Sequence, residues 1–241
     1  MKQLCFILAT FILSIAVPSH SSDDDFKSDR EWMVKRQINA QGITDGRIGV
    51  KNRSVLEAMR RVLRHEFVPD RYKSQAYVDM PLPIGYDQTI SQPYIVAYMT
   101  ELLDPKKEHK VLEVGTGSGY QAAVLAELVD HVYTIEIIKE LGESAEKRLK
   151  QLDYKNVTVK IGDGYFGWEE HAPYDAIIVT AAPDHIPPML IHQLKPGGKL
   201  CIPVGGRFQV QNLTLVQKTE SGSIMTRQVM PVVFVPLTGD H

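Results

Sequence analysis

The sequence predicts an α/β fold with a mostly parallel sheet, helices on both faces, an N-terminal helical extension and antiparallel strands near the C-terminus. Apolar segments alternate with helical ones through the centre of the chain, which is typical of a parallel sheet. One of these apolar segments runs directly into a glycine-rich turn. The length of 241 residues suits one α/β domain with some additions.

The N-terminal part of the chain has helical periodicity. Apolar residues between Phe26 and about Leu63 recur at helical spacing, with a break at residues 42–47. Residues 67–93 contain four prolines, so we expect an irregular loop there. Long loops in compact domains are often functional.

The central and C-terminal segments predict further elements in a regular order. The predicted strands are residues 110–114, 131–135, 157–161, 176–180 and 199–204, followed by 213–218 and 227–235. The predicted helices are residues 120–128, a helix with Leu141, Ala145 and Leu149 on one face, and a short helix at 187–194. We expect residues 195–198 to form a turn.

The composition is that of a globular protein, not of a disordered or coiled-coil one. Hydrophobic residues make up 44% and charged residues 23%, as in ordinary globular proteins, and the net charge of −2 favours no nucleic-acid partner. The cysteines are Cys5 and Cys201, and the histidines are scattered, so no cluster has metal-ligand spacing and we expect no metal.

Residues 1–22 resemble a secretory signal. Lys2 precedes an apolar run from Leu4 to Val17, and Ser19–Ser22 follow it. The run is shorter than the ~20 residues that a transmembrane helix needs. An uncleaved apolar tail or a wrongly assigned start codon is the alternative.

The glycine-rich turn at Gly115–Gly119 is the strongest local signal for a ligand site. Glycine lets the backbone adopt positive φ and lets a ligand approach closely. The spacing is G-x-G-x-G, whereas dinucleotide folds use G-x-G-x-x-G to direct a helix N-terminus at a pyrophosphate. The spacing therefore favours a ligand without a pyrophosphate, and a plain tight turn is the alternative.

Acidic residues follow the next two strands. Glu136, about 20 residues beyond Gly115, can accept hydrogen bonds from two ribose hydroxyls. Asp163, before Gly164, suits the amine of an adenine, although an ordinary Asp-Gly turn would have the same sequence. Together, the three strand ends favour an adenosyl ligand.

The glycine turn, Glu136, residues 162–164 and residues 194–198 resemble the class I S-adenosylmethionine methyltransferases, which have a Rossmann-like fold. A more specific resemblance lies in Asp79–Pro93, which is similar to the substrate loop of the protein-L-isoaspartate O-methyltransferase family. Residues 59–62, 66–69 and 234–237 also resemble this family, and the similarity covers about residues 30–238. Leu63 stands where the family commonly has a proline.

The resemblance implies transfer of a methyl group from S-adenosyl-L-methionine to the free carboxylate of isoaspartyl (or D-aspartyl) residues in damaged proteins, which begins their repair. It places Ser91 at the acceptor carboxylate as the catalytic candidate, with Thr89 as a weaker one. The implied substrate-binding residues are Thr89, Ile90, Ser91, Val235 and Pro236. The implied donor-binding residues are Glu113, Gly115, Thr116, Gly117, Ser118, Gly119, Glu136, Asp163 and Gly164.

These expectations divide the chain into a signal-like segment (1–22), N-terminal helices with the substrate loop (23–100), and a donor-binding core with the C-terminal strands (101–241). We expect a monomer without stable membrane association. The family and the cytosolic supply of the donor favour the cytoplasm, and residues 1–22 make the periplasm the rival compartment. An NAD-type oxidoreductase, a methyltransferase of small molecules or nucleic acids, and an adenosyl-binding module without catalysis are the alternative functions.

Overall fold

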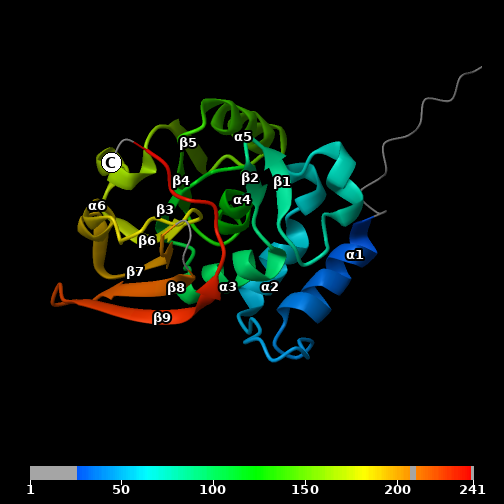
Figure 1. Cartoon of the computed structure of the whole chain (residues 1–241), viewed down its shortest axis with the longest axis horizontal. Coiled ribbons are helices and arrows are strands. Elements are labelled where there is room, and N and C mark those ends of the chain that lie inside the picture. The colour runs from blue at the N-terminus through cyan, green and yellow to red at the C-terminus, as the bar shows by residue number, and fades with distance from the viewer. Residues whose placement is uncertain (1–25, 207–209, 240–241) are drawn as a thin grey trace, which may run out of the picture.

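Apolar segments form the centre of a seven-stranded sheet in the computed structural model, which describes residues 26–206 and 210–239. The expected signal segment, residues 1–22, lies outside the described residues. In sheet order the strands are β5 (Val157–Ile161), β4 (His131–Glu136), β3 (Lys110–Val114), β6 (Tyr174–Val179), β7 (Leu194–Val204), β8 (Gln211–Lys218) and β9 (Ile224–Val232) (Figure 1). The first five strands in this order are parallel to one another, whereas β8 is antiparallel to β7 and β9 is antiparallel to β8. The predicted fold class is confirmed.

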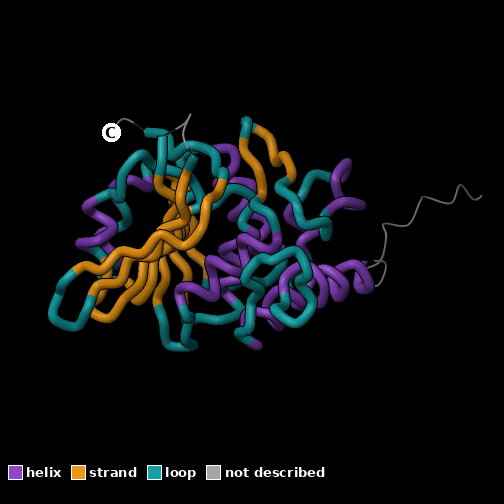
Figure 2. The backbone as a smooth tube through the Cα atoms, turned by 60° about the horizontal axis from the view of Figure 1, so that its bottom comes forward, coloured by secondary structure: helices purple, strands orange, loops and turns teal. Residues whose placement is uncertain are grey.

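Both faces of the sheet are covered by helices (Figure 2). Successive side chains of a strand point to opposite faces, so Val111 and Leu112 belong to two different buried clusters. One cluster includes residues of α2 (Arg53–Arg61), α3 (Pro93–Leu103), α4 (Tyr120–Ala126) and α5 (Lys139–Gln151). The other includes residues of α6 (Pro188–His192) and lies beside short 3-10 turns at Gly164–Phe166 and Glu169–His171.

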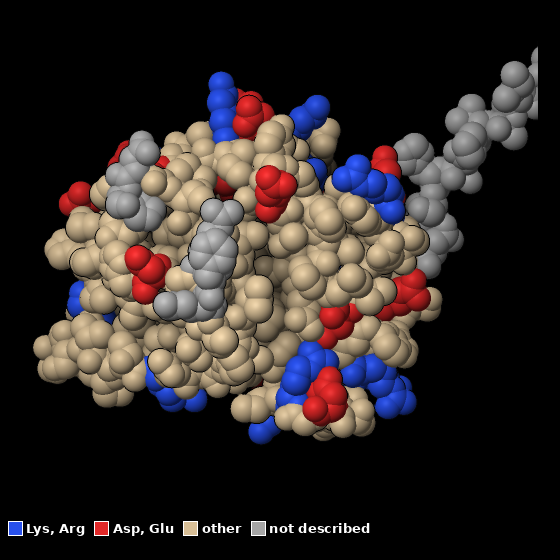
Figure 3. Space-filling view, viewed as in Figure 1, with Lys and Arg blue, Asp and Glu red and all other residues tan. Residues whose placement is uncertain are grey.

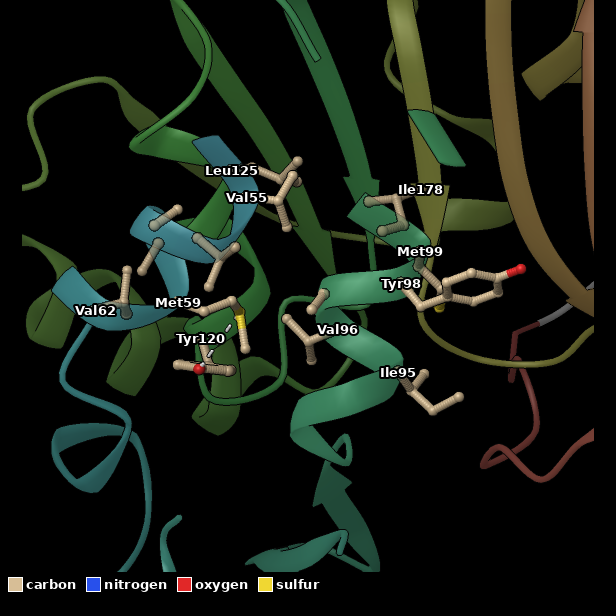
Figure 4. Packing of buried hydrophobic residues seen from close by; sticks show 14 of the residues in the cluster. Val55, Met59, Val62, Ile95, Val96, Tyr98, Met99, Tyr120, Leu125 and Ile178 are labelled. Carbon is tan, nitrogen blue, oxygen red and sulfur yellow. Dashed lines mark hydrogen bonds between the residues drawn. The ribbon is translucent and has the colours of Figure 1, made fainter. Parts of the chain in front are cut away.

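The predicted helical extension is present at the N-terminus. It comprises α1 (Lys27–Trp32), a π-helical turn (Met33–Ile38), α2, and 3-10 turns at Arg64–Phe67 and Asp70–Gln75. The side chain of Asn52 caps α2 by accepting hydrogen bonds from the backbone of Ser54 and Val55. Val55 and Met59 of α2 lie against α4 (Figure 4), so the extension packs directly on the core.

Helix α5 shows how the sequence pattern determines packing. Leu141, Ala145 and Leu149 are all buried, as their spacing predicts. A Cβ added at Gly119 would lie 3.2 Å from Leu149 Cδ1. Helix α5 therefore packs against the glycine-rich turn through Leu149.

Two elements differ from the sequence predictions. Residues 67–93 are not wholly irregular, because β1 (Leu82–Gly85) and β2 (Gln88–Ile90) form an antiparallel hairpin. Its turn residues, Tyr86 and Asp87, both have positive φ, which normally favours glycine or asparagine, so the sequence gives little signal for it. The expected turn at 195–198 lies within β7, as an irregularity between the pairs Tyr174↔Leu194 and Ala176↔Lys199.

Helix α3 was not predicted from the sequence. Most of its residues are buried, so its sequence lacks the polar face of an amphipathic helix. The expected boundary between residues 100 and 101 falls inside α3, and the division of the chain into parts stays a prediction.

Charged side chains of both signs are scattered over the face seen in Figure 3, and no large patch of one sign is visible there. Among the described residues, no helix is both long enough and apolar enough to span a bilayer.

Candidate active site

A cavity, here called the edge cavity, lies at the carboxyl ends of β3, β4 and β6. Ligands bind at this edge in open α/β sheets. Its lining includes the predicted residues Thr89, Ile90, Ser91, Glu113, Gly115, Thr116, Gly117, Ser118, Glu136, Gly164, Val235 and Pro236. Gly119 and Asp163 are not part of the lining. The structure thus brings together most of the predicted residues.

The glycine turn forms one wall of the edge cavity. Gly115, Gly117 and Gly119 have φ values of 97°, 53° and 88°, so each glycine of the G-x-G-x-G pattern occupies a left-handed backbone position. A Cβ at Gly115 would overlap Thr180 Oγ1, which donates a hydrogen bond to the Gly115 carbonyl at 2.7 Å. The turn can follow this path only with glycine at the first position.

Glu136 ties the glycine turn to the end of β4. One carboxylate oxygen accepts a hydrogen bond from the Gly117 backbone at 2.8 Å, and the other accepts from the Ile138 backbone at 2.9 Å. An ionised carboxylate has about four acceptor sites, so further hydrogen bonds to a ligand remain possible. Glu136 is therefore both a support of the turn and a candidate ligand acceptor.

Glu113 is a fully buried carboxyl group in the lining of the edge cavity. Thr134 donates to Glu113 Oε2 at 2.6 Å, and the Thr134 and Thr116 hydroxyls are 2.7 Å apart. Glu113 Oε1 has no hydrogen-bond partner among the described residues. Burial raises the pKa of Glu113 to about 8, although the bond from Thr134 lowers it; nearby Glu136 raises it further. The group is therefore mainly protonated at neutral pH, and its buried oxygen suits a polar, hydrogen-bonding part of a ligand.

Asp163 has a structural role that the sequence left open. Its side chain accepts a hydrogen bond from the Tyr165 backbone at 2.9 Å and caps the 3-10 turn that follows. This turn brings Gly164 to the edge cavity. Contact between Asp163 and an adenine stays a prediction.

A second cavity, the side cavity, adjoins the first. Thr89, Ser91, Thr180 and Val235 line both cavities. The rest of its lining comprises Arg47, Pro81, Gln92, Tyr94, Ile95 and residues 230–234. Ser91 therefore lies where two cavities meet.

Hydrogen bonds anchor the C-terminal segment beside the two cavities. The Ala182 backbone donates to the Val235 carbonyl at 2.8 Å, and the Leu237 backbone donates to the Ala182 carbonyl at 2.9 Å. The Gln211 side chain exchanges two hydrogen bonds with the backbone of Phe234. These bonds fix Val235 and Pro236 beside the cavities.

Several lining residues were missed by sequence reasoning. Thr180 follows β6, and the end of that predicted strand could have indicated it. Arg47 and Tyr94 lie outside any recognised pattern, so only the folded chain brings them to the side cavity. No group of three His, Cys, Asp or Glu side chains able to hold a metal occurs within residues 26–206 and 210–239.

Comparisons with known proteins agree on one family. The profile of the family described as protein-L-isoaspartate(D-aspartate) O-methyltransferase matches residues 37–241. The chain is 56% identical to protein-L-isoaspartate O-methyltransferase 2 of Syntrophobacter fumaroxidans, over 100% of this chain and 99% of the relative. It is 53% identical to protein-L-isoaspartate O-methyltransferase 1 of Cupriavidus necator, over 99% of this chain and 93% of the relative.

Solved structures show the same similarity. A protein-L-isoaspartate O-methyltransferase is 28% identical with a TM-score of 0.75, over 89% of this chain and 66% of that one. A Plasmodium falciparum structure, described as a beta-aspartate methyltransferase in complex with S-adenosyl-L-homocysteine, is 26% identical with a TM-score of 0.72. That match covers 88% of this chain and 97% of the other.

The raised pKa of Glu113 predicts how stability depends on pH. Above its ordinary value of 4.5 and below about 8, the folded chain keeps a proton that the unfolded chain releases. This group therefore lowers the free energy of unfolding as pH rises, by up to about 1.4 kcal/mol per pH unit. Glu113→Gln should remove this contribution to the pH dependence of the free energy of unfolding, which is measured by urea unfolding from about pH 5 to about pH 8.

Glu108→Gln, at an exposed carboxylate, is the matched control and should keep the wild-type pH dependence. Parallel pH curves for wild type and Glu113→Gln would contradict a raised pKa at Glu113.

Proposed function

This chain belongs to the protein-L-isoaspartate(D-aspartate) O-methyltransferase family, and we propose that it methylates the free carboxylate of isoaspartyl residues in damaged proteins. S-adenosyl-L-methionine is the methyl donor. The observation that carries the proposal is the meeting of two cavities at Ser91, within a family match that spans residues 37–241. One cavity has the features of a donor site, and the other opens beside it for an acceptor.

The edge cavity fits the donor. Gly115 and Gly117 line it without projecting a side chain into it, and the unpaired oxygen of buried Glu113 offers a hydrogen-bonding group. Glu136 would hold the ribose, and residues at the Asp163–Gly164 turn would face the adenine. When bound, the donor supplies a methyl group carried on a sulfonium cation.

The acceptor chemistry needs no general base. A carboxylate with a pKa near 4 is already ionised at neutral pH, so it can attack directly. The chain has to align the acceptor and exclude water, because water stabilises separated charges more than a transition state in which they cancel. Ser91 would donate a hydrogen bond to the non-attacking oxygen, since a bond to the attacking oxygen would weaken it.

Neighbouring residues would hold the acceptor chain. Thr89 and Ile90 precede Ser91 on the hairpin, and Val235 and Pro236 face the same space from the C-terminal segment. We further propose that the chain works as a monomer, without nucleic acid and without stable membrane association.

The supply of the donor favours one compartment. We propose the cytoplasm, because the donor is made there, against export directed by residues 1–22. Export requires a mature chain that begins between about Ser19 and Asp23. Cell fractionation with N-terminal sequencing should recover an intact Met1 in the cytosolic fraction; a cleaved chain in the periplasm would overturn the proposal.

The proposed activity is tested with a peptide pair. Labelled S-adenosyl-L-methionine should transfer its methyl to an isoaspartyl peptide and hardly at all to its aspartyl twin. The reason is that the two peptides place the free carboxylate at different distances from the main chain. Equal labelling of both peptides would exclude the repair assignment.

Ser91→Ala tests the orienting hydrogen bond. We expect turnover to fall roughly tenfold to a thousandfold, while donor affinity measured by calorimetry stays nearly unchanged. Ser74→Ala, at an exposed serine, is the matched control. Wild-type turnover in Ser91→Ala would remove Ser91 from the mechanism.

A further inference from the structure

The side cavity has one charged side chain in its lining, Arg47. The remaining lining residues are apolar or neutral, and Ser91 marks the end of the cavity that meets the edge cavity. An isoaspartyl peptide whose carboxylate lies at Ser91 has to continue into neighbouring space. Arg47 is therefore placed to meet the chain that flanks the damaged residue.

The guanidinium of Arg47 is held in place before any acceptor arrives. Nε donates to Asp45 Oδ2 at 2.8 Å, and Nη1 donates to Asp79 Oδ2 at 2.7 Å. The guanidinium carbon also lies 4.3 Å from the centroid of the Tyr94 ring. Because these contacts already restrict the side chain, little rotamer freedom remains to be lost on binding.

Asp79 connects Arg47 to the segment that carries Ser91. Its carboxylate also accepts hydrogen bonds from Gln92 Nε2 and from the Tyr94 backbone, each at 2.9 Å. Gln92 is adjacent to Ser91 in the chain, so a single carboxylate sets the positions of Arg47 and of the catalytic candidate. The spacing between the two is thus built into the fold.

Charge and hydrogen bonding together select the partner of Arg47. With Asp45 and Asp79, Arg47 forms a cluster with a net charge of −1, which does not favour a second carboxylate. The third nitrogen, Nη2, donates to no atom of the residues that the structure describes. A neutral carbonyl oxygen satisfies such a donor without adding negative charge.

We propose that Arg47 is a specificity-determining residue that donates from Nη2 to a main-chain carbonyl of the acceptor, next to the isoaspartyl residue. This inference rests on the proposed function. Arg47 distinguishes a damaged residue within a chain from a small molecule that carries only a carboxylate.

The test combines enzyme variants with substrate variants. Arg47→Met should raise the KM for an isoaspartyl peptide about 10-fold to 100-fold, the range for a lost hydrogen bond to a charged group, with kcat within about twofold. Donor affinity by calorimetry should not change. Arg36→Met, at an exposed arginine, is the matched control and should behave as wild type.

The same peptide is then prepared with each flanking amide replaced in turn by an alkene, which lacks the carbonyl oxygen. One replacement should raise the wild-type KM by the same factor as Arg47→Met and should have no further effect in that variant. A purely structural role of Arg47 would not produce this coupling. Arg47→Lys, which keeps the charge but loses the planar donor arrangement, should show the same loss of coupling if Arg47→Met does not fold.

A wild-type KM in the Arg47 variants, or penalties that multiply for every amide, would overturn the inference while leaving the proposed function intact. Failure of the wild-type protein to methylate the unmodified isoaspartyl peptide would instead overturn the proposed function.

Discussion

The carboxylate of Glu136 holds the glycine turn against the end of β4, and the edge cavity depends on this contact. It accepts from the backbones of Gly117 and Ile138 and thereby joins the turn after β3 to the chain after β4. The Ile135 carbonyl reinforces the joint by accepting from the backbone of Gly115 at 2.8 Å. Because glycines with positive φ have much conformational freedom when unfolded, an external clamp is needed to fix their path.

The acceptor side is assembled from segments that are distant in sequence. Asp79 fixes the segment of Ser91, and the Ala182 backbone fixes Val235. Both segments border the space where the edge and side cavities meet. Methyl transfer between two bound molecules requires such a shared wall, because most of the rate gain comes from alignment rather than from an acid or base.

Sequence reasoning succeeded where local pattern determines structure. The strand at 110–114, the glycine turn and the buried face of α5 follow from apolar periodicity and glycine spacing. It failed for α3, which is buried on most sides and so lacks a helical polar face. It also missed Arg47, whose bond to Asp79 spans 32 positions between two loops, and the buried state of Glu113, which depends on packing around Thr134. Such contacts depend on the tertiary structure and leave no periodic trace.

Calorimetric titration of S-adenosyl-L-homocysteine into Glu136→Ala tests most directly whether the Glu136 contact governs the site. We expect the binding free energy to be weaker by about 1–3 kcal/mol than in wild type, because hydrogen bonds to a charged group are lost. Glu140→Ala, at an exposed carboxylate in the first turn of α5, should bind as wild type does. Unchanged affinity in Glu136→Ala would contradict this role of Glu136, because the donor site would then form without its clamp.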